Sequence, residues 1–189
     1  PYWVPTIRVL YGYALVQQGK TRKGLAQMQG GIKHFREVGH HLGMPFLLAL
    51  LADCYQRTGR TEQGLALLVE ADARARASAE GYCLSEVYRV RGELLLQQSR
   101  TEGQADAEAA FQRAREIACQ QGARLLELRA ATSLARLWQQ QGKCVEASTL
   151  LREIYSGFTE GFDTADLRAA RALLQEFERS RAPSISASR

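Results

Sequence analysis

The stretch YALVQQGKTRKGLAQM, residues 13–28, decides the fold of this chain. An apolar run ends in two glutamines, the pair Gly19-Lys20 interrupts it, and a second partly apolar run follows. A small residue followed by a basic one returns at Gly59-Arg60, Ser99-Arg100 and Gly142-Lys143, at intervals of 40, 40 and 43 residues. Glycine between two helix-periodic runs interrupts a helix, so this spacing predicts repeated helical hairpins.

A second set of glycines has a similar period and marks the other end of each predicted pair: Gly39, Gly81, Gly122 and Gly161. Between the two sets, apolar residues recur three or four positions apart, as they do in amphipathic helices. We therefore predict an all-α array with repeats at residues 6–39, 45–80, 82–121 and 123–157. A closing helix at 163–179 completes a single domain, 1–179, and a flexible Ser- and Arg-rich tail follows at 180–189.

Two local details of this array are also predicted. Thr61 is expected to cap the helix that follows the second turn, because a threonine oxygen can accept a backbone N–H there. The third turn differs, since Ser99 replaces glycine and the linker RTEGQAD, residues 100–106, is longer. We expect an irregular stack at that linker.

The composition is that of a globular helical protein, with 46% hydrophobic residues and a net charge of +5. The longest apolar run, PFLLALLA at 45–52, is far shorter than a membrane span of roughly 20 residues. The start, PYWVPTIRVL, lacks the basic region of a signal peptide, and without an initial Met it is expected to belong to an excised fragment. The four cysteines form no CxxC pair, and together these features favour a reduced, cytoplasmic setting.

The positive charge is concentrated in the first third of the chain. Residues 1–60 hold eight Lys or Arg and two Asp or Glu, whereas residues 61–189 hold 17 and 18. We interpret the basic segment as a solvated face. The alternatives are a surface that attracts nucleic acid or an acidic neighbouring domain.

The positions around each turn resemble the tetratricopeptide repeat. In that repeat a small residue stands seven positions before the turn glycine, another five after it, a large apolar residue nine after it, and often an alanine twelve after it. Four segments fit, the third with a three-residue shift: Gly12/Gly19/Gly24/Met28, Ala52/Gly59/Gly64/Leu68/Ala71, Gly92/Ser99/Ala107/Phe111/Ala114 and Ala135/Gly142/Ala147/Leu151. The resemblance covers residues 6–156, with a period nearer 40 than 34. It implies a right-handed superhelix in which the first helix of each pair lines a concave groove.

A narrower resemblance covers residues 126–177. The elements WxxxGK, from Trp138 to Lys143, and GFxTxDLxxAxxLL, from Gly161 to Leu174, resemble the terminal repeats of large bacterial signalling proteins. In those proteins a nucleotide cyclase or DNA-binding domain precedes an AAA-type ATPase module and a tetratricopeptide-like array. The resemblance implies that the catalytic parts lie upstream of this chain.

No catalytic, metal or cofactor site is predicted. Gly19-Lys20-Thr21 ends like a P-loop, but Ala14 stands where that motif requires a glycine. The three histidines, His34, His40 and His41, have no Cys or acidic pair nearby to complete a zinc site. Ser, Cys and His form no recognisable nucleophile group, so we do not expect the chain itself to be an enzyme.

The predicted site is the groove. Repeat register places eleven residues on its exposed side: Tyr13, Gln17, Asp53, Gln56, Arg57, Arg89, Glu93, Gln97, Thr132, Arg136 and Gln139. Their mixture of charge, glutamine and an aromatic ring suits a peptide or a neighbouring domain, although solvated positions would look the same.

We expect a protein-binding regulatory array of a bacterial signalling ATPase or nucleotide cyclase. The alternative is the effector or oligomerisation array of a transcriptional activator. Neither a membrane nor nucleic acid is expected as a partner, and a homo-oligomer is left open.

Overall fold

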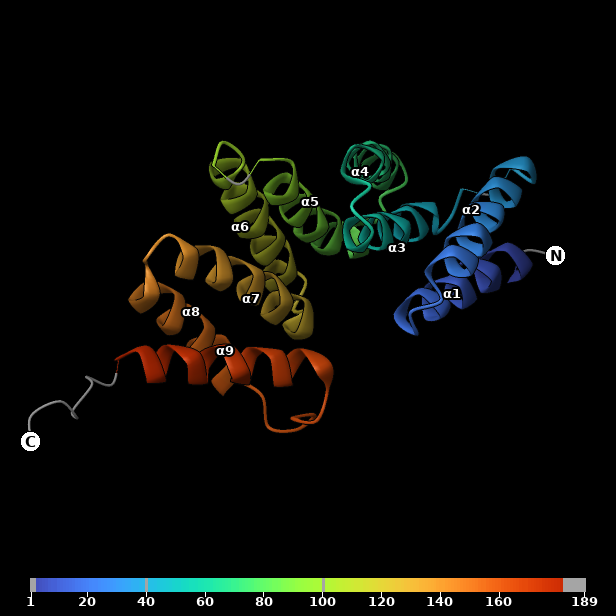
Figure 1. Ribbon diagram of the computed structural model, residues 1–189. Helices are drawn as coiled ribbons and strands as arrows, with labels where there is room; N and C mark the ends of the chain where they lie inside the picture. The colour runs from blue at the N-terminus through green and yellow to red at the C-terminus, as the bar shows by residue number, and fades with distance from the viewer. Residues whose placement is uncertain (1–2, 40, 100, 182–189) are drawn as a thin grey trace, which may run out of the picture. The chain divides into compact units, whose positions relative to one another are not determined.

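The described residues of the computed structural model, 3–39, 41–99 and 101–181, are helical and contain no β-strand. The elements follow one another in Figure 1 as α1 (Trp3–Gln17), α2 (Thr21–Glu37), α3 (Met44–Arg57), α4 (Thr61–Ala77), the 3-10 turn η1 (Gly81–Cys83), α5 (Leu84–Gln98), α6 (Gln104–Gln120), α7 (Arg124–Gln140), α8 (Cys144–Ser156) and α9 (Ala165–Arg181). The predicted all-α class is confirmed. No described helix combines the length and apolar character needed to cross a lipid bilayer.

The chain divides into two compact units, Pro1–Ala110 and Phe111–Arg189, and each is described by itself. The division falls inside α6. One continuous repeat domain over residues 1–179 therefore stays a prediction.

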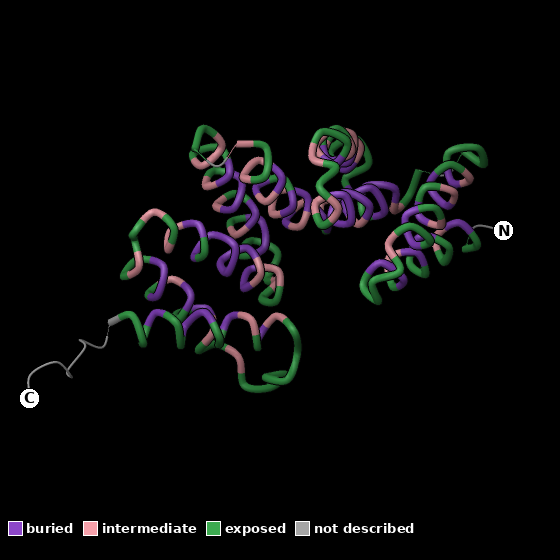
Figure 2. Tube along the Cα trace, viewed as in Figure 1, coloured by how far each residue is buried: buried purple, intermediate pink, exposed green. Residues whose placement is uncertain are grey.

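In the first unit, neighbouring helices pack as hairpins that lie against one another. α1 packs on α2 and α3 on α4, while α3 also contacts α1, α2 and α5. The interior is built from apolar side chains of α1 to α5, which Figure 2 shows as buried stretches along each helix. Its largest fully buried members include Met28, Phe35, Met44, Leu48 and Leu94. Burial of these side chains supplies the main driving force for stacking the hairpins.

Two glycines set the distance between α1 and α2. A Cβ atom added to Gly12 would lie 2.6 Å from the carbonyl oxygen of Gly24, and one added to Gly24 would lie 2.5 Å from that of Gly12. Both distances are shorter than atoms tolerate, so only glycine fits at this crossing. The small residues seven before and five after the first turn are therefore there for helix packing.

The turn glycines close each helix with backbone hydrogen bonds. Gly19 has a φ of +79°, and its N–H donates to the Val16 carbonyl at 2.9 Å, while Lys20 N–H donates to Leu15 at 2.9 Å. This is the Schellman pattern, which satisfies the last carbonyls of a helix. The Lys20 carbonyl then accepts the N–H of Gly24, so the basic residue also begins the next helix. The turns at Gly59 and Gly142 repeat the same bonds.

The same geometry corrects two predicted details. Arg60, not Thr61, occupies the N-cap of α4, and no side chain caps that helix end. The Thr61 hydroxyl instead donates to Gln97 Oε1 at 3.4 Å. Gly81 does not end α4, because Ala79 takes the left-handed conformation with a φ of +56° and Gly81 starts η1. Cap and turn positions thus shift by one or two residues from the sequence pattern.

The third turn differs from the others, as expected. Ser99 is extended, with φ −149° and ψ 117°, and its hydroxyl accepts the N–H of Glu102 at 3.1 Å. The Gly103 N–H donates to the Ser99 carbonyl at 3.1 Å before α6 begins at Gln104. At this turn a serine hydroxyl, rather than a left-handed glycine, therefore supplies a turn hydrogen bond.

In the second unit, α9 packs against both α7 and α8. The shared apolar core contains Leu128, Leu151, Leu167, Leu173 and Phe177. The closing helix was predicted at 163–179, but it runs from Ala165 to Arg181. Residues 180 and 181 of the predicted flexible tail are thus helical, and residues 182–189 lie outside the described part of the chain.

Candidate functional site

The predicted groove residues of the first unit converge on Asp53. Its side chain is only 11% exposed, so its expected exposure is wrong. It lies on α3, which packs against both α1 and α5. The Tyr13 hydroxyl donates to Asp53 Oδ2 at 3.3 Å, and Arg57 Nε donates to the same oxygen at 3.0 Å. On the other side, Arg89 Nη2 lies 3.5 Å from Asp53 Oδ1. A buried carboxylate needs such donors, because removing it from water without them would be costly.

Arg89 is the second centre of this site, and its side chain is 12% exposed. Its Nε and Nη2 donate to the two carboxylate oxygens of Glu86 at 2.8 and 3.1 Å, and its Nη1 lies 3.8 Å from Glu93 Oε1. Burial acts to lower the pKa of Arg89, but the carboxylates of Glu86, Asp53 and Glu93 outweigh it and raise that pKa. Arg89 therefore stays a cation at every physiological pH.

We call Tyr13, Asp53, Arg57, Glu86, Arg89 and Glu93 the Asp53 cluster. It holds three carboxylates and two guanidinium groups, so it carries one net negative charge. Arg57 is its most exposed charged member, and the carboxylate of Asp53 raises the pKa of Arg57 against the opposing effect of burial. Glu86 was not predicted, although its position three residues before Arg89 on one helix favours such an ion pair.

Two other predicted residues join α3 to α5 beside this cluster. Gln97 Nε2 donates to the backbone carbonyl of Gln56 at 2.9 Å. Gln17 is exposed at the last position of α1. Five of the eight predicted groove residues of the first unit thus make contacts between the first helices of successive pairs: Tyr13, Asp53, Gln56, Arg89 and Gln97. Arg57 and Glu93 pair with a residue of their own helix, and Gln17 lies at the edge.

The three predicted residues of the second unit behave differently from one another. Thr132 is buried, and its hydroxyl donates to the Leu128 carbonyl of its own helix at 2.7 Å, so its expected exposure is wrong. Arg136 is exposed and Gln139 is half-buried, both on α7. Whether these two extend the surface around Asp53 stays a prediction.

A separate apolar pocket of about 520 Å³ lies in the first unit among α1, α2, α3 and η1. Trp3, Phe35, Phe46 and Tyr82 line it, and the Phe46 and Tyr82 ring centroids are 6.3 Å apart. Its carboxylate, Glu80, accepts the Gly43 N–H at 2.6 Å and the Ser78 hydroxyl at 2.8 Å. Such a lining suits an apolar group better than a charged one.

The two cysteines of the first unit, Cys54 and Cys83, are buried. Burial, followed by the nearby Asp53 charge, raises the pKa of Cys54 to about 12, and burial raises the pKa of Cys83 to about 11. Both thiols are therefore protonated near neutral pH, where a nucleophilic cysteine must be a thiolate. The N–H groups of Gly19 and Lys20 are engaged by helix carbonyls and are not directed at a phosphate.

Among the described residues, no group of three or more His, Cys, Asp or Glu side chains is arranged to hold a metal ion. His34 is half-buried and His41 is exposed, whereas His40 lies outside the described residues. The polar contacts of the Asp53 cluster are thus the most developed candidate site.

No family model matches this chain. A protein of Rhizobium meliloti (strain 1021), which bears the name uncharacterized protein R02095, is 32% identical over 127 residues. The match covers 67% of this chain but only 12% of the relative. The matched segment is therefore a small part of that relative's length, and the activity of a whole protein is a matter for proposal.

Proposed function

We propose that this chain is a non-catalytic, protein-binding array, and that the Asp53 cluster is the surface that contacts its ligand. The finer fold in this proposal is a right-handed, tetratricopeptide-like superhelix of four helix pairs closed by α9. The observation that carries the proposal is the register of the cluster. Tyr13, Asp53 and Glu93 are spaced 40 residues apart, on α1, α3 and α5, and Asp53 contacts Tyr13 directly and Glu93 through Arg89.

The chemistry of the cluster favours an extended peptide as ligand. Side chains fixed by ion pairs lose little conformational freedom on binding, which favours affinity. The exposed Arg57 offers N–H donors, and the acidic side of the cluster, at Glu86 and Glu93, offers acceptors. A peptide that presents a basic or amide side chain toward Glu93 and a carbonyl or carboxylate toward Arg57 would complement both.

The source of the peptide follows from the resemblance of residues 126–177 to the terminal repeats of bacterial signalling proteins. We place this chain in the C-terminal regulatory array of a cytoplasmic, multidomain signalling ATPase or nucleotide cyclase. Its partner would then be a segment or domain of the same protein. The small share of the Rhizobium relative that the match covers is compatible with such a multidomain parent.

The test uses overlapping synthetic peptides that span the natural gene product outside this chain, titrated against the 189-residue protein by fluorescence anisotropy. We expect one peptide region to bind, and Arg57→Met or Glu93→Gln to weaken that binding about tenfold or more. Lys33→Met, on the exposed side of α2, is the matched control and should leave the affinity unchanged. Binding that is equally insensitive to all three substitutions would refute the proposed surface.

An alternative function is an effector or oligomerisation array of a transcriptional activator, with its basic first repeat near DNA. Three exposed cations, Lys20, Arg22 and Lys23, gather around the first turn and favour this reading. Other basic residues of the segment pair with acids, as Arg36 does with Glu70 at 2.7 Å. Measuring the affinity for duplex DNA at two salt concentrations distinguishes the two hypotheses, because a phosphate-binding surface loses affinity steeply as the salt concentration rises.

A further inference from the structure

The first helix exposes a stripe of large apolar side chains. Val4, Ile7, Leu10 and Tyr11 are between 43% and 61% exposed, and exposed Ala14 extends the same row. Their spacing of three, four and seven positions places them along one side of α1. A contiguous apolar surface of this kind on a folded protein marks an interaction site.

The 40-residue period identifies the residues that occupy the same positions one repeat later, so their burial can be compared. Val4, Ile7 and Tyr11 correspond to Met44, Leu47 and Leu51 on α3. The α1 residues are 55%, 61% and 52% exposed, whereas their α3 counterparts are 0%, 1% and 3% exposed. Cys54, the counterpart of Ala14, is also fully buried. The same stripe is thus exposed on α1 and covered on α3.

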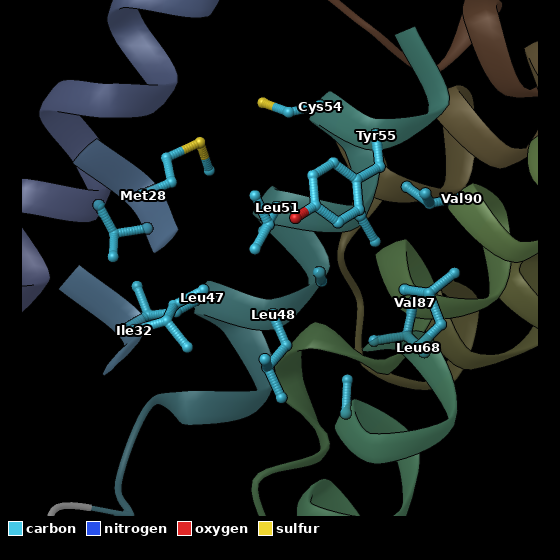
Figure 3. Close-up of a cluster of buried hydrophobic side chains, with 14 of the residues drawn as sticks. Met28, Ile32, Leu47, Leu48, Leu51, Cys54, Tyr55, Leu68, Val87 and Val90 are labelled. Carbon is cyan, nitrogen blue, oxygen red and sulfur yellow. The ribbon is translucent and has the colours of Figure 1, made fainter. Parts of the chain in front are cut away.

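The cover over the α3 stripe is the preceding hairpin. Figure 3 shows Leu47 and Leu51 turned toward Met28 and Ile32 of α2, and α3 contacts both α1 and α2. Leu48 lies on the other side of α3, toward Leu68 and Val87. The Tyr55 hydroxyl instead reaches α2, where Gln29 Nε2 donates to it at 2.7 Å. Each first helix of a pair therefore has one side for the hairpin before it and another for the elements that follow.

α1 already uses its second side in the same way. Gly12, the counterpart of Ala52, is in contact with Gly24 of α2, and Arg8, the counterpart of Leu48, donates from Nε to Gln27 of α2 at 2.9 Å. The stripe lies on the opposite side from these contacts. On α5 the register is looser, since Val87 and Leu94 are buried at the positions of Leu47 and Cys54 but exposed Arg91 replaces Leu51.

We propose that the stripe of Val4, Ile7, Leu10 and Tyr11 is the seat of one further helical hairpin of the same polypeptide, placed one repeat before α1. Its second helix would present apolar residues four positions apart, as Met28 and Ile32 do to α3. The interface would continue the one already formed between α1–α2 and α3. Only residues 38–43 separate α2 from α3. With an equally short loop, a hairpin directly before α1 in the same polypeptide would be the nearest source of such a helix. This inference is independent of the Asp53 cluster and does not depend on peptide binding.

The experiment adds a hairpin in register. A second copy of residues 3–43 is joined directly to Val4, so that the copied Gly43 precedes α1 as the original Gly43 precedes α3. We expect the thermal midpoint of the extended chain to rise by about 5 °C or more over that of the 189-residue protein, because the stripe becomes buried. Amide hydrogen exchange in α1 should slow in parallel.

Variants of the original α1 test whether the added hairpin packs on the stripe. Ile7→Arg with Tyr11→Arg should abolish the gain in the extended chain, yet leave the midpoint of the 189-residue protein within about 2 °C, since both positions are exposed there. Gln18→Arg, exposed at the end of the helix, is the matched control and should retain the gain.

Two results would overturn the proposal. The first is an extended chain whose midpoint and α1 exchange are unchanged by the added hairpin or by the double substitution. The second is a concentration-dependent dimer of the 189-residue protein, seen by sedimentation velocity, that the double substitution dissolves. That result would assign the stripe to a second copy of the chain.

Discussion

The Arg89 guanidinium on α5 lies 3.5 Å from the Asp53 carboxylate on α3, and this ion pair ties together two hairpins whose first helices are 40 residues apart. Both side chains are close to 90% covered, so neither charge is well solvated. Arg89 also pairs with Glu86 and Glu93 on its own helix. One buried arginine therefore contacts carboxylates from two helices.

Replacing that arginine with an apolar residue of similar length should be costly. Arg89→Met leaves Asp53 with Tyr13 and Arg57, but it removes the bidentate partner of Glu86. We expect a loss of about 3–5 kcal/mol in the free energy of unfolding, as for other buried pairs that lose one member. Urea denaturation followed by circular dichroism measures it. Lys33→Met, which breaks an exposed pair with Glu37, should change the value by less than about 0.5 kcal/mol.

The helix crossing at Gly12 predicts opposite effects for two similar substitutions. Gly12→Ala places a Cβ 2.6 Å from the Gly24 carbonyl oxygen, so the helices must separate, at a cost of about 1–3 kcal/mol. Gly30→Ala on α2 meets only the guanidinium end of the exposed Arg8 side chain, which can turn aside at the cost of its exposed hydrogen bond to Gln27, and should stabilise by up to about 1 kcal/mol through helix propensity. Thermal unfolding of both variants checks the signs, and equal signs would contradict the packing argument.

The Gly12–Gly24 crossing also illustrates what the sequence could predict. The small residues at fixed offsets from each turn glycine were recognised as a repeat signature, and the structure shows that Gly12 and Gly24 let α1 and α2 approach closely. The 40-residue period predicted that Tyr13, Asp53 and Arg89 share one side of successive first helices, and these side chains are in contact. These features depend on spacing alone. Helix bounds followed to within about one to three residues, because glycine with a positive φ ends a helix by a local rule.

Other features depended on side-chain geometry that spacing does not contain. Glu86 joins the cluster because Arg89 turns back along its own helix, and Thr132 is buried because its helix packs more deeply than register implied. Thr61 is not the cap, because Arg60, the last residue of the Schellman turn, is already the N-cap of α4.

Ala79 gives a prediction about stability at a turn. It holds a φ of +56°, at the position where Gly19, Gly59 and Gly142 close the other helices. The left-handed conformation costs a residue with a Cβ about 1 kcal/mol, so Ala79→Gly should stabilise the protein by up to that amount. Gly59→Ala should destabilise it by a similar amount, because Gly59 has a φ of +70° and nothing nearby compensates. Paired urea titrations test whether the two changes have opposite signs.

Cys54 predicts a loss of stability in alkaline solution. Its pKa is raised from 9.0 to about 12 in the folded state, because burial and the Asp53 charge disfavour the thiolate. Below pH 9 the thiol is protonated in both states and contributes no pH dependence. Between pH 9 and 12 only the unfolded chain releases this proton, so the free energy of unfolding falls with a slope of about 1.4 kcal/mol per pH unit from this group.

Cys54→Ala should remove that slope while leaving a constant offset from the lost packing. Urea unfolding of the parent and the variant at several pH values from 8 to 10.5 measures the difference. A difference that does not change with pH would show that the Cys54 thiol titrates alike in the folded and unfolded chains.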